Sequence, residues 1–190
     1  MQARAGEETA ILGQDQVDWL LAQLKASKAT WKAVFCDMPL GLHVPDGNER
    51  WEAVANGDNG AARGRELEIA RLLKGIKDPG IENVVWFTAD VHYTAAHYYD
   101  PSSAVFDDFE PFWEFVSGPL NAGSFGPNKV DETFGLQVKY AKGPGQPNMS
   151  PYAGLQFFGQ VDIEPEAQTM TVTLKNLDNH TLFTQVLTPA

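Results

Sequence analysis

Apolar residues recur along the first half of the chain with the spacings of helices and of buried strands. Between residues 14 and 27 they occupy the i, i+3, i+4, i+7 positions of one helix face, which predicts an amphipathic helix. Residues 31–37 then form a short apolar run closed by a proline and a glycine, a pattern typical of a buried strand. The same two patterns return at residues 65–77 and 83–89. The order strand, helix, strand predicts a right-handed βαβ unit whose two strands are parallel neighbours.

The pattern differs in the rest of the chain. Residues 43–64 are rich in glycine and asparagine and predict a long loop inside the βαβ unit. Seven of the 12 prolines lie between Pro101 and Pro151, which predicts a mostly irregular region interrupted by short strands such as 113–116. Period-2 alternation then returns in three segments and predicts an antiparallel meander. These segments are residues 155–163, 168–175 and 181–187.

Together the patterns predict one partial domain of the α/β (α+β) class. It would consist of an α/β part at residues 11–100, a loop-rich region at 101–154 and antiparallel strands at 155–190. A length of 190 residues suits one ordinary domain or half of a larger one. Hydrophobic residues make up 43% of the chain, which is enough for a packed core and argues against intrinsic disorder.

Charge and composition exclude several classes of partner. Lys and Arg number 14 against 25 Asp and Glu, a net charge of −11, which is the reverse of what a nucleic-acid-binding surface needs. No apolar run approaches the roughly 18 residues of a membrane-spanning helix, so neither nucleic acid nor membrane is predicted as a partner. Cys36 is the only cysteine, which excludes an intrachain disulfide and a cysteine-based zinc cluster. An acidic chain can still bind a phosphate ester where a metal cation reverses the local field.

The sharpest candidate for chemistry follows the second predicted strand. Asp90 and His92 stand at i and i+2, where side chains of an extended segment point the same way and could reach one cation. Asp37 follows the first strand, and the carboxyl ends of parallel strands are where open α/β sheets place their ligands. Carboxylate and imidazole together suit iron, zinc or manganese better than calcium alone. Structural roles remain open for all three: a cap for Asp37, a cap for Asp90 and a satisfied buried histidine for His92.

Other polar residues are weaker candidates. An acidic cluster could serve as the carboxylate pair of a glycosidase, although a solvated acidic loop is the better interpretation. The cluster comprises Asp107, Asp108 and Glu110. His97 lies among aromatic residues and is interpreted as structural, whereas His43 and His180 lie in loop segments and are predicted to be solvated.

Six short segments resemble PhoD-like (alkaline phosphatase D type) metallophosphatases. They span nearly the whole chain from residue 11 onward. They are residues 12–16 (LGQDQ), 29–32 (ATWK), 56–58 (NGD), 64–70 (GRELEIA), 89–93 (ADVHY) and 114–123 (EFVSGPLNAG). The resemblance implies half of a calcineurin-like phosphoesterase β-sandwich with flanking helices, and hydrolysis of phosphate monoesters or diesters with a metal-activated water.

The resemblance also implies metal ligands. Asp37-x-Pro39 stands where such enzymes have an H-x-P-like turn, and Asp90-x-His92 stands where they have G-H-x-H. Asp37, Asp90 and His92 are therefore the implied metal ligands. The extra carboxylates favour iron with calcium, with zinc or manganese as alternatives.

The chain departs from the family in its first part. The motifs D-x-[DHN], G-D-x-x-D and G-N-H-[DE] hold most metal ligands and the catalytic histidine of such enzymes. Gly57-Asp58 lacks the later aspartate and Gly47-Asn48-Glu49 lacks the histidine. We therefore expect the C-terminal half of such an enzyme, with no catalytic residue of its own, binding one cation weakly or none, and inactive alone.

Partners and location follow from the same resemblance. A half-domain implies an N-terminal half as partner, or self-association into a dimer or higher oligomer, with a phosphate ester as substrate of the complete enzyme. PhoD-like enzymes are commonly secreted, which favours a periplasmic or extracellular location. The alternative function is a non-catalytic α/β module that keeps the fold and acts by protein association.

Overall fold

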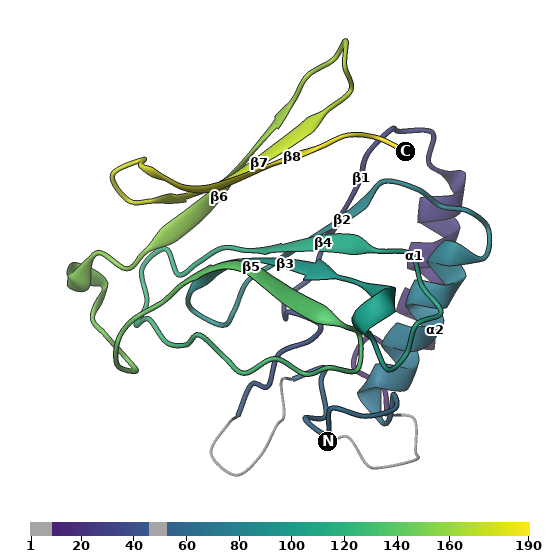
Figure 1. Ribbon diagram of the computed structural model, residues 1–190, viewed down its shortest axis with the longest axis horizontal. Helices are drawn as coiled ribbons and strands as arrows, with labels where there is room; N and C mark the ends of the chain where they lie inside the picture. The colour runs from purple at the N-terminus through teal and green to yellow at the C-terminus, as the bar shows by residue number, and fades with distance from the viewer. Residues whose placement is uncertain (1–8, 46–52) are drawn as a thin grey trace.

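The computed structural model describes residues 9–45 and 53–190, and it contains two α-helices and eight strands within those ranges. Figure 1 shows their arrangement. In chain order they are α1 (Gln14–Ala26), β1 (Lys32–Phe35), α2 (Arg65–Lys77), β2 (Val84–Thr88), β3 (Thr94–Tyr99), β4 (Phe112–Val116), β5 (Leu136–Lys142), β6 (Phe157–Ile163), β7 (Met170–Asn176) and β8 (Thr181–Leu187).

Five strands form the central sheet in the order β1-β2-β4-β3-β5. β1 and β2 are parallel neighbours, which confirms the βαβ unit, and β4 continues the parallel arrangement on the other side of β2. β3 then pairs antiparallel with both β4 and β5. The remaining strands form a separate antiparallel sheet in the order β6-β7-β8, which confirms the predicted meander. Two sheets with few helices make the chain a member of the α+β class, as predicted.

The central sheet is covered on both faces. Successive residues of a strand point to opposite faces, and β2 shows this with Trp86 in the hydrophobic core shared with α1 and α2, and Val85 in the core shared with β7 and β8. In Figure 1 the sheet of β6–β8 lies above the central sheet, and both helices stand together at its right. The helices approach closely at Gly75, where a Cβ atom would lie 2.7 Å from a methyl carbon of Leu21.

Two strands of the central sheet were not predicted. In β3 all residues but Tyr98 are buried, because the strand lies between β4 and β5 with both faces covered, so its sequence shows no alternation. β5 lies within the proline- and glycine-rich stretch that was predicted to be irregular. The region 101–154 therefore contributes both β4 and β5 to the first sheet. Within the described residues, no helix is both long enough and apolar enough to cross a membrane.

Candidate functional site

Asp37, Asp90 and His92 lie just beyond the carboxyl ends of two neighbouring parallel strands, β1 and β2. The two strand ends are joined past the sheet, because the Ala89 N–H donates to the Asp37 carbonyl oxygen at 3.0 Å. Both aspartates are exposed, and neither carboxylate forms a hydrogen bond or ion pair with any other described residue. Two uncompensated carboxylates thus stand at the edge where α/β sheets bind ligands.

The segment that carries Asp90 and His92 is not extended, contrary to the sequence-based expectation. Both residues have left-handed backbones, with φ of 58° and 62°. Val91 between them is buried, and its N–H donates to the Ala89 carbonyl at 2.7 Å. A tight bend therefore sets the direction of the two side chains. Left-handed residues other than glycine cost free energy and cluster at functional sites, so two at alternate positions favour a functional role for this bend.

The imidazole of His92 is held in one tautomer. Its Nδ1 lies 2.5 Å from the Gly123 carbonyl oxygen, and a carbonyl can only accept a hydrogen bond, so Nδ1 carries the proton. The neutral ring then has its lone pair on Nε2. The His92 carbonyl accepts from the Phe125 N–H at 3.1 Å, which ties the bend to the segment after β4 a second time. This is how proteins commonly orient a metal-binding histidine, and residue spacing gave no sign of the role of Gly123.

A pocket of about 740 Å³ opens beside this bend. Three segments line it: the one that follows the Asp37 turn, the bend between β2 and β3, and the loop between β4 and β5. The lining residues are His43, Val44, Pro45, Asp90, Val91, His92, Phe125, Gly126, Pro127, Asn128 and Lys129. Asp90 and His92 belong to this lining and Asp37 does not.

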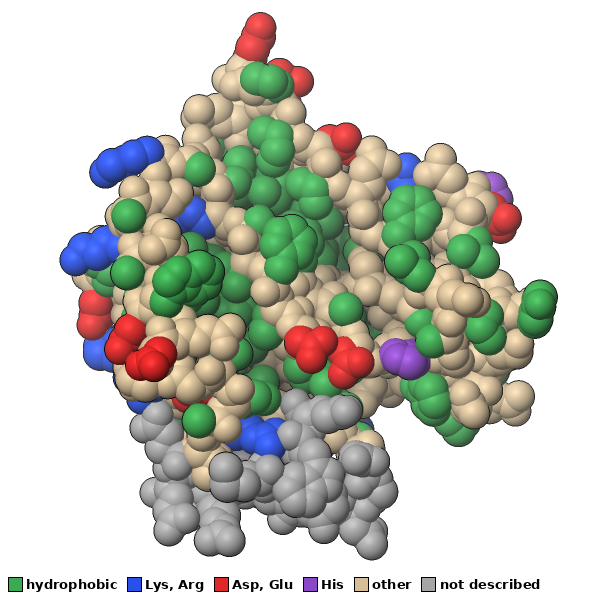
Figure 2. Space-filling model, turned by 180° about the vertical axis from the view of Figure 1, so that it is seen from behind, with side chains coloured by type: hydrophobic (Ala, Val, Ile, Leu, Met, Phe, Trp, Pro, Cys, Tyr) green, Lys and Arg blue, Asp and Glu red, His purple; other side chains and the backbone are tan. Residues whose placement is uncertain are grey.

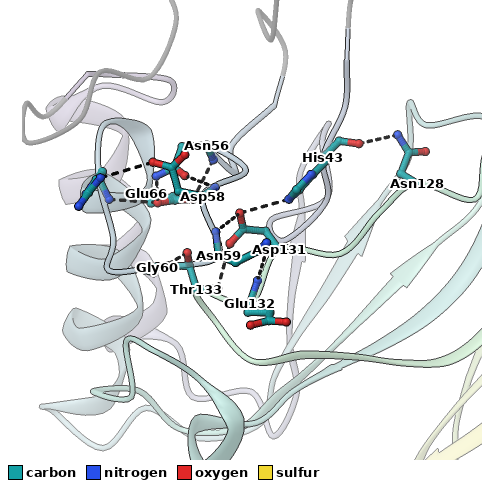
Figure 3. A network of polar contacts seen from close by, with 11 residues as sticks. His43, Asn56, Asp58, Asn59, Gly60, Glu66, Asn128, Asp131, Glu132 and Thr133 are labelled. Carbon is teal, nitrogen blue, oxygen red and sulfur yellow. Dashed lines mark hydrogen bonds and ion pairs between the residues drawn. The ribbon is translucent and has the colours of Figure 1, made fainter.

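His43 corrects the prediction that it is solvated. Its side chain is only 20% exposed, and its Nε2 lies 3.4 Å from a carboxylate oxygen of the fully buried Asp131 (Figure 3). The backbone of His43 is fixed as well, because its N–H donates to the Lys129 carbonyl at 2.9 Å and its carbonyl accepts from the Asn128 side chain at 2.8 Å. The sequence could not reveal this pairing, since His43 and Asp131 are 88 positions apart and meet only through the Leu42–Val130 bridge.

Glu66 in the first turn of α2 organises the loop that contains Asn56 and Asp58 (Figure 3). Its carboxylate accepts from the Asn56 N–H at 2.8 Å and from the Arg63 N–H at 3.0 Å. Complete burial, followed by the charges of Asp131 and Asp58, raises the pKa of Glu66 to about 7. The Asp58 carboxylate forms an exposed ion pair with Arg63 at 3.5 Å, and the Asp58 N–H donates to the Asn56 side chain at 2.8 Å. The resembling segments 56–58 and 64–70 thus meet in one structural contact.

Glu68 plays the same part for the start of α1. Its carboxylate accepts three backbone N–H groups, from Ile11 at 3.0 Å and from Leu12 and Gly13 at 2.8 Å each. These N–H groups lie at or just before the N-terminus of α1, where the helix itself offers them no hydrogen-bond partner. Segment 12–16 is therefore joined to segment 64–70, which explains physically why the two occur together.

Another buried carboxylate holds the turn after Asp37. Glu114 on β4 is fully buried, and it accepts from the Leu40 N–H at 2.9 Å and from the Tyr99 hydroxyl at 3.0 Å. His97 Nδ1 lies 2.8 Å from the same carboxylate, so His97 has the structural role predicted for it. Burial, together with the charge of Glu114, raises the pKa of Tyr99 well above its usual value. These contacts fix the turn that presents Asp37.

The acidic cluster does not form a carboxylate pair. Asp108 is bound by Lys74 at 2.6 Å and Lys77 at 3.0 Å, and hydrogen bonds from these lysines lower the pKa of Asp108. Asp107 and Glu110 are exposed. The cluster is the solvated acidic loop that was preferred over a glycosidase site.

Comparison with known proteins gives the family. A family model described as PhoD-like phosphatase matches residues 1–174. The chain belongs to the PhoD-like phosphatase family. A solved structure described as "Structure of PhoD" is similar over 94% of this chain with a TM-score of 0.53 and 17% identity, which shows the fold. No curated protein sequence matches.

The chain spans 32% of the length of that solved PhoD chain. Its fold is therefore that of one part of a longer relative, and its assignment as the C-terminal half of an enzyme stays a prediction. Within residues 9–45 and 53–190, no three or more His, Cys, Asp or Glu side chains lie close enough together to hold a metal ion. The sequence Gly47-Asn48-Glu49 lies outside the described residues. The assignment of Asp37, Asp90 and His92 as ligands also stays a prediction.

Proposed function

We propose that this PhoD-like chain is the metal-binding C-terminal portion of a phosphoesterase that hydrolyses phosphate esters. The observation that carries the proposal is the hydrogen bond from His92 Nδ1 to the Gly123 carbonyl, which leaves Nε2 available as a ligand in a pocket that also contains the unpaired Asp90 carboxylate. Family membership supports the reaction class. A cation bound there would supply charge stabilisation for the phosphoryl oxygens.

The described residues would supply only part of the coordination shell. Asp37 follows the adjacent strand and lies outside the pocket lining. The other ligands would come from a second polypeptide segment that carries the missing motifs. Two carboxylates and one imidazole form a hard oxygen and nitrogen set that suits iron with calcium, or else zinc or manganese. A periplasmic or extracellular location stays a prediction, which fractionation of the source cells would test.

Zinc should bind this chain weakly through His92. In a titration followed by NMR of the histidine ring signals, we expect the His92 signal to move first, since its Nε2 is the free one. His92→Ala should weaken zinc binding by about tenfold, because it removes the only nitrogen among the three proposed ligands. His180→Ala is the matched control, because His180 is exposed and lies outside the pocket. Equal zinc affinity of the wild-type chain and His92→Ala would refute the ligand assignment.

The alternative, a non-catalytic association module, has support in an apolar surface beside β1. β1 is an edge strand of the central sheet, so one side of its backbone has no strand partner among the described residues. Phe35 on this strand is 80% exposed and stacks on Phe87 at 5.3 Å. Figure 2 shows hydrophobic side chains gathered across the middle of the face seen from behind, bordered below by acidic side chains and a histidine.

We expect this surface to cause self-association of the isolated chain. Unpaired strand edges and large apolar patches both favour association, and here they adjoin. Sedimentation velocity at micromolar concentration should show a dimer or higher oligomer. Phe35→Ser should shift the distribution toward monomer, whereas Tyr152→Ser, at an even more exposed aromatic residue that lies outside the strand edge, should leave it unchanged. A purely monomeric wild-type profile would count against the surface.

A further inference from the structure

Part of the pocket is not used by the proposed metal donors. Asp90 and His92 come from the bend after β2, but the segment 125–129 contributes to the lining a side chain of the opposite charge, Lys129. Lys129 is exposed, and within the described part of the chain its ammonium group forms no hydrogen bond or ion pair. An exposed ammonium group in the lining of a pocket, without a partner among the described residues, is placed to bind an anion.

His43 adds a second polar side chain to the same pocket. Its Nε2 lies against the buried Asp131 carboxylate, whereas its Nδ1 makes no hydrogen bond within residues 9–45 and 53–190. The backbone contacts between His43, Asn128 and Lys129 hold the segments of His43 and Lys129 together. A carboxylate only accepts hydrogen bonds, so Nε2 carries the proton when it faces Asp131, and Nδ1 is then the nitrogen with the lone pair.

We propose that Lys129 and His43 form an oxyanion-binding subsite that receives the phosphoryl oxygens of a phosphate ester. The proposal rests on the proposed function, because the ester would lie between these two side chains and a cation held at Asp90 and His92. Lys129 would bind one non-bridging oxygen as a point charge, and His43 Nδ1 would accept a hydrogen bond from a protonated phosphate oxygen. In this subsite, residues of this chain would stabilise the charge of the phosphoryl oxygens independently of the metal.

The remaining lining indicates the kind of ester. Phe125 is 39% exposed in the pocket, with its ring edge-on to His92 at 5.5 Å between centroids. Val44, Pro45 and Pro127 add apolar surface. A volume of about 740 Å³ exceeds the needs of a phosphate group alone and falls in the range of small-molecule sites. The pocket therefore favours an ester with a flat, apolar leaving group that packs against Phe125.

Binding of inorganic phosphate and phenyl phosphate to the metal-free chain, followed by NMR, tests the subsite. Lys129→Ala should weaken binding of both by about fourfold, because a partly exposed charge pair is lost. Lys129→Arg should restore most of it. Lys139→Ala is the control, since Lys139 is an exposed lysine of β5 outside the pocket. Phe125→Ala should remove any preference for phenyl phosphate over phosphate.

Asp90→Asn separates this inference from the proposed function. Removal of the carboxylate should tighten phosphate binding, by relief of repulsion, while it weakens zinc binding. If zinc binds through His92 but phosphate affinity is the same in wild type and Lys129→Ala, the subsite is wrong and the proposed function stands. If phosphate depends on Lys129 but zinc ignores His92, the subsite stands and the metal assignment is wrong. Phosphate that binds elsewhere, with no response at Lys129 or His43, also overturns the subsite.

Discussion

The purified 190-residue chain should show almost no turnover of an aryl phosphate, even with added iron, calcium, zinc or manganese. Two-metal hydrolysis needs cations that stabilise both the attacking and the leaving oxygen. The described residues contain no cluster of three ligands, and Asp37, Asp90 and His92 could hold at most one cation. General acid–base catalysis by the family's catalytic histidine, whose motif was not found in this sequence, would raise the rate by a further factor of roughly 10²–10⁴. Initial rates with each metal are the measurement.

The same assay identifies which residues act once the site is complete. Addition of a second polypeptide that carries G-D-x-x-D and G-N-H-[DE] should restore turnover, because the two parts would share one metal centre. His92→Ala should then lower the restored rate by on the order of 10²-fold or more, since it removes a metal ligand. His180→Ala should not change it. Robust turnover by the chain alone, unaffected by His92→Ala, would show that the reaction occurs elsewhere.

The sequence predicted those elements whose pattern of apolar residues reflects a single requirement, the burial of apolar side chains. α1 and α2 bury a single face, so their apolar residues recur with the helical period. β1 and β2 are short, apolar and bounded by turns, although β1 is an edge strand in which only Val34 is buried and not the buried strand that was predicted. β6–β8 alternate because one face of that sheet is exposed. Their order along the chain was enough to place Asp37 and Asp90 at adjacent strand ends, which the Ala89–Asp37 hydrogen bond confirms.

The features that the sequence did not predict depend on contacts between distant segments. The tautomer of His92 is set by a carbonyl 31 positions away, and the environment of His43 is set by Asp131. The left-handed bend at Asp90 and His92 was missed because neither residue requires such a backbone, as a glycine would suggest. None of these contacts produces a periodic pattern in the sequence, so local patterns could identify candidate residues but not the orientation of their side chains.

Glu114→Leu should destabilise the chain by about 3–5 kcal/mol, because it removes one member of a buried polar network and leaves the others unsatisfied. The Leu40 N–H, the Tyr99 hydroxyl and the His97 ring all lose their acceptor, and Glu114 has no exposure that would let water replace it. His97 Nε2 is already buried without a hydrogen-bond partner among the described residues, so the loss of Glu114 would leave neither ring nitrogen of His97 satisfied. Urea unfolding followed by tryptophan fluorescence gives the free energy of unfolding.

Two further variants separate charge from hydrogen bonding in this network. Glu114→Gln keeps one acceptor oxygen, and it should cost less than Glu114→Leu. Glu110→Leu, at an exposed acidic residue, should change the free energy of unfolding by no more than about 0.5 kcal/mol.

Glu114 anchors Leu40, three residues after Asp37, so a loss confined to stability would limit Glu114 to a structural role. Weaker zinc binding by folded Glu114→Gln would instead make Glu114 a positioning residue for Asp37. Wild-type stability in Glu114→Leu would mean that the turn is held by its buried apolar residues alone.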